Sequence, residues 1–311
     1  MYSQHRSVTL NIVSTSSSEQ LHENAYIRGR AWTKRLSHNK VITDDRDQAV
    51  TVKSPDHGWF DSIAAAYAEQ RPHYPDSIFR WIASQAPDQN LCWDAACGNG
   101  QASLGLADFF ATVIATDLSS NQIEAAPPHP RIQFRVASAE NSGLATECCS
   151  AVICATAIHW LDVDCFNQEC LRVLSPGGLL VWLGYDPIQG APAPIQQWLD
   201  DLYLQRLKCW WPPQRRHVEA RYRDLTFPGK SEQLPRNHFI VLRWSMHDLL
   251  GFISTWSALR LAKQKGTDLL PKLQKELTHL WGYEETEINL FLPLMGRWGI
   301  PKPIAIPPRL T

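Results

Sequence analysis

Short apolar runs alternate with helical patterns through the middle of the chain. The runs are LCWDAA (91–96), TVIATD (112–117), IQFRVA (132–137), SAVICAT (150–156) and GLLVWLG (178–184). Continuous Val, Ile, Leu and Ala are typical of strands that are covered on both faces. Helical patterns lie between them, including residues 102–111 and 164–174. Repeated strand–helix units predict a parallel, doubly wound α/β sheet with right-handed crossovers.

Two helices are predicted before the first strand and form an N-terminal helical cover. Residues 59–70 place apolar residues at helical spacing, and RPHYP (71–75) ends that helix because a residue before proline is pushed out of the α region. Asp76 is expected to cap the second helix, which ends at Pro87. Residues 1–53 are polar without a sustained period and are interpreted as a disordered tail.

The part of the chain after residue 186 is expected to be mostly helical. Residues 189–197 have the composition of a Pro/Gly-rich linker. The later segments are a helical, aromatic region (197–223), a sixth strand (239–244), helices at 248–263 and 269–281, and a last, antiparallel strand in 289–298. The fold prediction is therefore a seven-stranded, Rossmann-like α/β sheet with a C-terminal helical region.

Composition narrows the class of protein. The chain has 311 residues, of which 44% are hydrophobic, and its net charge is −1, so nothing indicates an electrostatic grip on nucleic acid or an anionic membrane. No segment approaches the ~20 continuous apolar residues of a membrane helix. The N-terminus lacks an apolar signal region, and the predicted location is cytoplasmic.

Cysteines and charged runs are interpreted as structural features. The eight cysteines contain no C-x-x-C spacing, and Cys148 and Cys149 are adjacent, which favours reduced thiols in a cytosolic protein and predicts no metal site. The runs QRRH (214–217) and RYRDL (221–225) are interpreted as solvated faces.

The loop after the first strand is the strongest sign of a ligand. Asp94 lies near the end of that strand, and Gly98 and Gly100 follow in a loop whose N–H groups can hold a polar or anionic group. Asp117 ends the second strand, 23 residues after Asp94, and this spacing is close to the ~20 expected for a carboxylate that binds ribose hydroxyls. Glu140 follows the third strand, where it could contact a base. The pattern predicts an adenosine-type ligand at the carboxyl edge of the sheet.

Two kinds of adenosine ligand fit this pattern. A dinucleotide site requires G-x-G-x-x-G, whose third glycine lets helix and strand pack closely. Ser103 stands at that position, three residues after Gly100. A nicotinamide-dependent oxidoreductase therefore stays open as an alternative but departs from the expected motif.

The segment DAACGNGQ (94–101) resembles motif I, D-x-G-x-G-x-G, of the class I S-adenosylmethionine-dependent methyltransferases. It departs from the motif in one place, since Ala96 stands at the position of the first glycine, and a slightly altered turn is expected there. Seven further segments resemble the small-molecule branch of that family, sometimes catalogued with the trans-aconitate type. They are YAEQRPHYP (67–75), ATDLS (115–119), ASAE (137–140), ATAIHW (155–160), RVLSPGG (172–178), WWPP (210–213) and residues 244–260.

The resemblance implies one methyltransferase domain at 54–311, with a cofactor half at 54–185 and a substrate-pocket insertion with the last strands at 186–311. It implies S-adenosylmethionine as cofactor. It also implies cofactor-binding roles for Asp94, Ala96, Gly98, Gly100, Asp117, Leu118, Ala139, Glu140, Tyr67 and Arg71. Arg71 could bind the methionine carboxylate of the cofactor or an acidic substrate.

Candidate substrate contacts are mostly aromatic. His159, just past the fourth strand, is the candidate general base or polar clamp, with a loop histidine satisfied by backbone as the alternative interpretation. The predicted substrate-pocket residues are Tyr74, Trp160, Trp210, Trp211, Trp244 and Trp256. The expected reaction is methyl transfer to a small-molecule acceptor, with a carboxylate or hydroxyl oxygen favoured. A non-catalytic S-adenosylmethionine-binding protein is the second alternative, and the oligomeric state is left open.

Overall fold

The computed structural model describes residues 71–302, all of which belong to one compact unit, Lys53–Thr311. The predicted tail at 1–53, the predicted helix at 59–70 and Tyr67 lie outside the described residues.

A single large sheet organises the described part of the chain. Its strands are β1 (Leu91–Ala95), β2 (Thr112–Asp117), β3 (Ile132–Val136), β4 (Cys149–Ala155), β5 (Leu174–Tyr185), β6 (Glu232–Gln233), β7 (Phe239–Trp244) and β8 (Ile288–Gly299). The order is β3-β2-β1-β4-β5-β8-β6, and β1 to β5 are parallel. The chain therefore winds outward from β1 in one direction and from β4 in the other, which confirms the doubly wound prediction.

The strand count differs from the prediction, since the sheet has eight strands where the sequence predicts seven. The additional strand, β6, is only two residues long and is too short to leave a hydrophobic pattern. β8 spans 12 residues and serves two neighbours. Its second half pairs with β5 and β6, and its first half pairs with β7, the predicted sixth strand, outside the main strand order.

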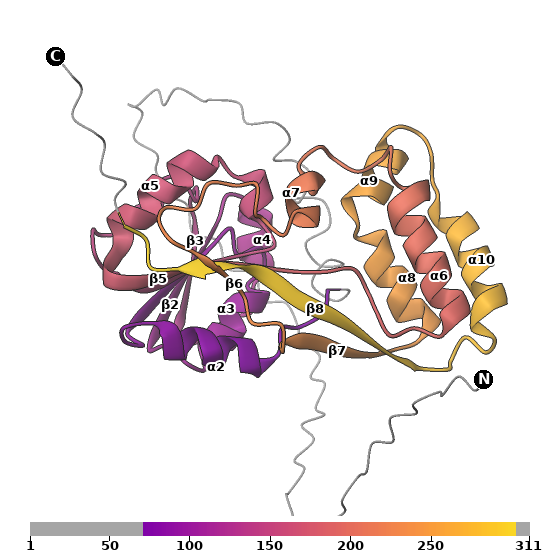
Figure 1. Ribbon diagram of the computed structural model, residues 1–311, viewed down its shortest axis with the longest axis horizontal. Coiled ribbons are helices and arrows are strands. Elements are labelled where there is room, and N and C mark those ends of the chain that lie inside the picture. The colour runs from indigo at the N-terminus through magenta and orange to yellow at the C-terminus, as the bar shows by residue number, and fades with distance from the viewer. Residues whose placement is uncertain (1–70, 303–311) are drawn as a thin grey trace, which may run out of the picture. The chain divides into compact units, whose positions relative to one another are not determined.

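Alternate residues of the central strands point into two separate core layers, as the two-residue repeat of a strand requires. On β1, Cys92 packs into the layer that contains Phe79 and Leu106, whereas Trp93 packs into the layer that contains Phe166. Figure 1 shows α2 and α3 below the sheet and α5 above it. Both faces of the sheet are thus covered, which explains the continuous apolar runs in the sequence.

Eleven helical segments are present in residues 71–302. They are α2 (Asp76–Gln85), α3 (Gln101–Leu106), α4 (Ser120–Ala125), η3 (Ile158–Trp160), α5 (Val163–Val173), α6 (Ala193–Asp201), the π-helix η4 (Leu202–Arg206), α7 (Arg215–Glu219), α8 (Met246–Ser254), α9 (Ser257–Gln264) and α10 (Leu270–Trp281).

Three local predictions were wrong. Pro75, with extended backbone angles, is the N-cap of α2, and Asp76 lies inside the first turn. The predicted linker at 189–197 contains the start of α6, because proline is tolerated in a first helical turn. The helix expected at 102–111 ends at Leu106, since Ala111 and Thr112 donate backbone hydrogen bonds to the segment before β1.

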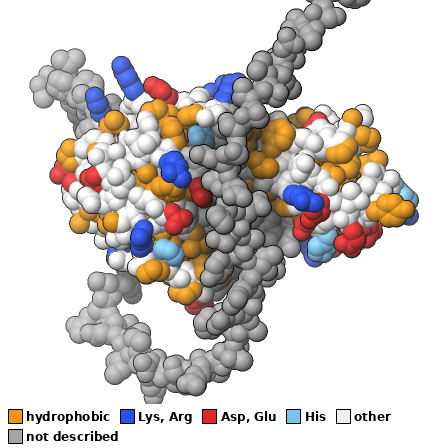
Figure 2. Space-filling model, turned by 90° about the horizontal axis from the view of Figure 1, so that it is seen from below, with side chains coloured by type: hydrophobic (Ala, Val, Ile, Leu, Met, Phe, Trp, Pro, Cys, Tyr) orange, Lys and Arg blue, Asp and Glu red, His pale blue; other side chains and the backbone are white. Residues whose placement is uncertain are grey.

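The C-terminal helices lie near the first half of β8, the half that pairs with β7. Figure 1 shows α6, α8, α9 and α10 side by side there, with β7 along β8, and α10 contacts both α6 and α8. On the face seen in Figure 2, basic and acidic side chains are interspersed among apolar ones, in keeping with the small net charge. None of the helices in residues 71–302 has the length and apolarity needed to span a bilayer.

Candidate functional site

The loop after β1 uses three left-handed residues in five positions. Ala96, Gly98 and Gly100 have φ values of 54°, 56° and 87°. A Cβ added at Gly98 would meet Gln122 Oε1 at 3.8 Å, an ordinary van der Waals contact, so there is room for a further atom at this glycine. A Cβ at Gly100 would lie 2.6 Å from the Phe134 ring. Gly100 is therefore required by packing, whereas Gly98 leaves room for a ligand to approach the backbone.

Replacing Ala96 with glycine is expected to raise the free energy of unfolding by about 0.5–1 kcal/mol. A left-handed backbone costs alanine about 1–2 kcal/mol, and the greater unfolded-state entropy of glycine offsets part of that gain. Chemical denaturation measures the change. Ala95→Gly, in the buried strand next to it, is the control and should destabilise the protein. Equal destabilisation by both variants would contradict the backbone-strain argument.

Asp94 is fully buried at the end of β1. Ser103 Oγ on α3 donates to its Oδ2 at 2.5 Å, so the residue that stands in place of a dinucleotide-type glycine has a role of its own. Oδ1 is buried and has no hydrogen-bond partner among the described residues. Burial raises the pKa of Asp94 to about 7, helped by the charge of Asp117 and opposed by the Ser103 hydrogen bond. A buried orphan acceptor of this kind fits a cationic or N–H-bearing ligand group.

Asp117 ties the ends of β1 and β2 together. Its Oδ2 accepts from the Gly98 N–H at 2.8 Å, and its Oδ1 accepts from the Ser119 N–H at 2.9 Å. The neighbouring Leu118 is 47% exposed, so its side chain is available to a ligand. This carboxylate is therefore held at the carboxyl edge of the sheet, where the sequence predicts the ribose of the ligand.

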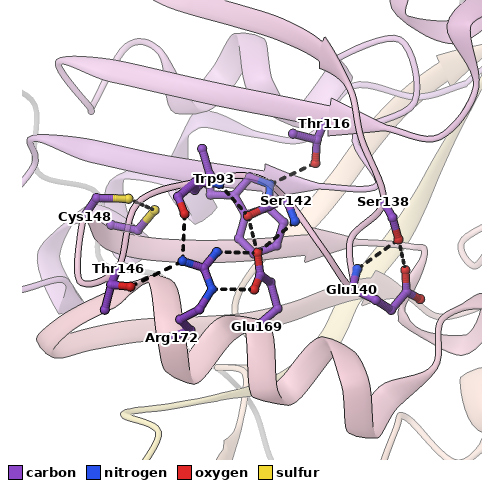
Figure 3. A network of polar contacts seen from close by, with 11 residues as sticks. Trp93, Thr116, Ser138, Glu140, Ser142, Thr146, Cys148, Glu169 and Arg172 are labelled. Carbon is purple, nitrogen blue, oxygen red and sulfur yellow. Dashed lines mark hydrogen bonds and ion pairs between the residues drawn. The ribbon is translucent and has the colours of Figure 1, made fainter. Parts of the chain in front are cut away.

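The loop after β3 completes this edge. Ala139 is buried, and Glu140 accepts hydrogen bonds from Ser138 Oγ and, at 3.1 Å, from the Asp162 N–H. Figure 3 shows how the following turn is fixed, since the Ser142 N–H and hydroxyl both donate to the buried Glu169.

An ion pair on α5 secures the same turn. Arg172 donates to both oxygens of Glu169, at 2.8 and 2.7 Å, and to the Leu144 carbonyl at 2.7 Å. Burial alone would raise the pKa of Glu169, but the hydrogen bonds from Arg172 and Ser142 hold it below its ordinary value. This bidentate pair anchors the loop that presents Glu140.

Because β1, β2 and β3 are adjacent and parallel, Asp94, Asp117 and Glu140 lie at one edge of the sheet. Strand order reverses between β1 and β4, and ligands of doubly wound sheets bind at that position. The open backbone at Gly98 and the orphan oxygen of Asp94 fit a nucleoside with a cationic amino-acid tail. No cluster of three or more His, Cys, Asp or Glu side chains within 71–302 could hold a metal ion.

A cavity opens next to this edge, beyond the ends of β4 and β5. Of the predicted substrate residues, Trp160, Trp211 and Trp256 line it, as do Arg71 and His159. Two other predicted tryptophans, Trp210 and Trp244, pack half-buried against the core and do not line the cavity.

The segment before α2 borders the same cavity. Tyr74 forms a hydrogen bond with the Thr156 hydroxyl at 2.7 Å, and Thr156 is one of the lining residues. Arg71 Nη1 donates to the Tyr185 hydroxyl, and Gln101, the first residue of α3, donates to the Arg71 carbonyl at 3.2 Å. Arg71 thus lies between the glycine loop and the cavity.

His159 is half-buried at the edge of the cavity, and its imidazole is neutral. Its ring stacks on Tyr222 with a centroid distance of 6.1 Å and an interplanar angle of 16°, and its Nδ1 has no partner among the described residues. Burial, with the charges of Arg215, His217 and Arg71, lowers the pKa of His159 to about 3. The imidazole is therefore a very weak base at neutral pH.

Arg215 is the main lining residue that sequence reasoning missed. Its guanidinium stacks over Trp211 at 4.7 Å and over Tyr203 at 5.0 Å, and its only hydrogen bonds within the described residues go to the Tyr203 hydroxyl. No carboxylate of residues 71–302 pairs with it. It is half-buried beside His159, and no counter-ion for it is found in the described part of the chain.

The interpretation of 214–217 and 221–225 as solvated faces was wrong for three residues. Arg215 lines the cavity, Tyr222 is fully buried, and Arg221 forms a bidentate ion pair with Asp186. Arg221 and Tyr222 also have φ values of 52° and 60°. Two successive left-handed residues turn both side chains inward, and their letters give no signal of that turn.

Comparison with known proteins gives consistent matches. A family model described as a methyltransferase domain matches residues 93–182. A solved structure from Anaeromyxobacter dehalogenans that bears the name type II methyltransferase is 38% identical, with a TM-score of 0.68, and the match covers 75% of this chain and 99% of that one.

Curated relatives agree. A protein of Dictyostelium discoideum named as a methyltransferase is 27% identical over 73% of this chain and 87% of its own length. The ubiquinone/menaquinone biosynthesis C-methyltransferase of Syntrophotalea carbinolica is 40% identical over 44% of this chain, and the match spans only 55% of that enzyme.

Proposed function

This chain belongs to the class I S-adenosylmethionine-dependent methyltransferases, and from that premise we propose that it methylates a carboxylate oxygen of a small-molecule acceptor bound in the cavity beside His159. The observation that carries the proposal is Arg215, a half-buried cation that lines the cavity without a carboxylate partner in the described residues. A desolvated guanidinium with free N–H donors favours an anionic ligand.

The cofactor is S-adenosylmethionine, and family membership decides against the two alternatives, a nicotinamide-dependent oxidoreductase and a non-catalytic binding protein. When bound, it supplies a methyl group on a sulfonium, which is already an activated electrophile. For its binding we propose that Asp94 and the backbone at Gly98 hold the methionine part, with Arg71 on its carboxylate. Asp117 would bind the ribose hydroxyls, and Leu118, Ala139 and Glu140 would surround the adenine.

His159 favours a carboxylate over a hydroxyl as acceptor. A hydroxyl acceptor usually requires a base with a pKa near the operating pH. The pKa of His159 is about 3, so its imidazole is poorly suited to remove a proton from an alcohol. A carboxylate oxygen accepts a methyl group without losing a proton. The chain's residues then need only to bind, orient and exclude water.

Each residue of the cavity has a task under this proposal. Arg215 binds the acceptor carboxylate, and Tyr203 and Trp211 fix the guanidinium in place. The neutral His159 ring forms a polar part of the cavity wall, and its stacking on Tyr222 holds it in place. Nearby, the ion pair of Arg221 with Asp186 neutralises a carboxylate that would otherwise repel the acceptor.

The proposal is tested by incubating the enzyme with deuteromethyl-labelled S-adenosylmethionine and a panel of organic acids, alcohols and phenols. We expect labelled products whose methyl group is released as methanol by mild alkali, because esters hydrolyse under conditions that ethers, methylated amines and methylated carbons survive. Label that is stable to alkali would overturn the carboxylate assignment while leaving methyl transfer intact.

Between pH 6 and 9, kcat/KM is expected to show no ionisation that belongs to His159, because a group with a pKa of about 3 stays neutral throughout that range. His159→Ala should lower kcat/KM by less than about 10-fold, whereas loss of a general base costs about 10²–10⁴-fold. His159→Gln, which is polar but does not titrate, serves as the control. A rate limb near pH 6.5 that vanishes in both variants would identify His159 as a base.

Asp117→Ala is expected to weaken the binding of S-adenosylhomocysteine by about 1.5–3 kcal/mol, the scale of a hydrogen bond to a charged group, or roughly 10- to 150-fold. Titration calorimetry measures the dissociation constant. Glu124→Ala, which removes an exposed carboxylate from α4, is the matched control. An unchanged affinity in Asp117→Ala would remove this residue from the proposed ribose site.

A further inference from the structure

We propose that the acceptor is a monocarboxylic acid with a flat, apolar body, which lies against Trp211 and Trp256 while its single carboxylate meets Arg215. This inference rests on the proposed function, because it takes the cavity beside His159 as the acceptor site. The proposed function names only the group that is methylated, and this inference also names the chemical class of the whole acceptor molecule.

Four aromatic rings that line the cavity form a continuous series. Tyr203 lies 5.1 Å from Trp211 and 5.7 Å from Trp256, measured between ring centroids. Trp211 and Trp256 are 5.7 Å apart, and Phe252 continues the series at 6.0 Å from Trp256. Trp211 and Trp256 are only partly buried, so each keeps surface that a ligand can cover. Rings of this kind gain most by covering flat apolar surface.

Three arginines, Arg71, Arg215 and Arg260, line the cavity. Within residues 71–302, Asp186 is the one carboxylate in that lining, and Arg221 pairs with both of its oxygens. Arg71 donates to Tyr185 and Arg260 has an interaction partner of its own. Within the described residues, the hydrogen bonds of Arg215 go to a neutral hydroxyl alone. This cation therefore favours an anionic group on the ligand.

The hydrogen bonds of Arg215 also show which of its donors stay available to a ligand. Its Nε and Nη2 atoms donate to the Tyr203 hydroxyl, which leaves both hydrogens of Nη1 and one of Nη2. That free edge is the bidentate site for a carboxylate, and it lies in the plane of the guanidinium. Because the guanidinium carbon lies 4.7 Å from the centre of the Trp211 ring, a carboxylate bound at this edge lies near the indole.

A polyacid fits these surroundings poorly. Once one carboxylate has met Arg215, a second carboxylate that lay against the Trp211 and Trp256 rings would be removed from water beside apolar surface. Burying an unpaired carboxylate costs several kcal/mol, whereas covering aromatic surface with an apolar body is favourable.

The test is titration calorimetry on the full chain saturated with S-adenosylhomocysteine, with three probes: cinnamate, its neutral analogue cinnamamide, and propane-1,2,3-tricarboxylate. We expect cinnamate to bind at least 10-fold more tightly than either of the others. Arg215→Gln should remove the preference of cinnamate over cinnamamide, and Trp256→Ala should weaken cinnamate at least 10-fold. Arg216→Gln, an exposed neighbour on α7, should change neither affinity.

The outcomes separate the two proposals. Tighter binding of the tricarboxylate that still requires Arg215 overturns the apolar monoacid but supports a carboxylate acceptor. Binding of no acid in an Arg215-dependent way, with S-adenosylhomocysteine still bound, overturns both. If Trp256→Ala fails to fold or to bind S-adenosylhomocysteine, the ranking of the three probes on the unaltered protein decides, and equal affinities for cinnamate and the tricarboxylate count against the inference.

Discussion

Arg215→Gln is expected to lower kcat/KM for an acid acceptor by roughly 30- to 1000-fold, corresponding to about 2–4 kcal/mol. The glutamine keeps a hydrogen-bond donor but removes the charge and the bidentate edge. Because this contact forms with the acceptor before and during methyl transfer, the loss should lie mainly in KM, with kcat at saturation changed less. Initial rates at varied acceptor and saturating S-adenosylmethionine separate the two constants.

Two further variants show which property of Arg215 matters. Arg215→Lys keeps the charge without the planar fork, so it should recover only part of the affinity. Arg216→Gln changes an exposed arginine on the same helix and should leave both constants within about 2-fold, as surface changes usually do. If Arg215→Gln and Arg216→Gln had the same small effect, the cavity would not be the place where an acid binds.

The parallel strands β1 to β5 could be predicted because their signals are local. TVIATD predicts β2 with both bounds correct, since a fully buried strand shows as a continuous apolar run that ends at Asp117. Parallel topology then brings Asp94, Asp117 and Glu140 to one edge without any knowledge of side-chain contacts. The same reasoning predicts the doubly wound sheet, which the structure confirms.

The cavity beside His159 could be predicted only in part, because it is built by tertiary packing. Tyr203 lies on the π-helix η4, a rare conformation that often marks functional positions and leaves no pattern in sequence. Arg215 and Tyr222 stand in polar runs that would suit a solvated face, and a strained turn at 221–222 directs the second of them into the core. Trp210 and Trp211 are neighbours with the same letter, yet only Trp211 lines the cavity.

Asp94→Asn is expected to flatten the pH dependence of stability. The pKa of Asp94 in the folded chain is about 7, raised by burial, against about 4 in the unfolded chain. The folded state therefore holds the proton more tightly, and the free energy of unfolding falls as pH rises from about 4 to about 7. Three pKa units correspond to about 4 kcal/mol, which is lost across this window in the unaltered protein and retained in the variant.

Urea denaturation at pH 4.5, 6 and 8 measures the effect, and the difference between proteins isolates Asp94 because all other groups titrate equally in both. Asp108→Asn, at an exposed position after α3, is the control and should follow the unaltered protein. Parallel curves for Asp94→Asn and the unaltered protein would mean that water or a counter-ion reaches Oδ1 of Asp94.

The same proton links stability to ligand binding. If the amino group of S-adenosylhomocysteine meets Asp94, it stabilises the ionised carboxyl, and binding at pH 6 should release a proton. Calorimetry in buffers of different ionisation enthalpy measures the number of protons released. We expect the release in the unaltered protein and not in Asp94→Asn.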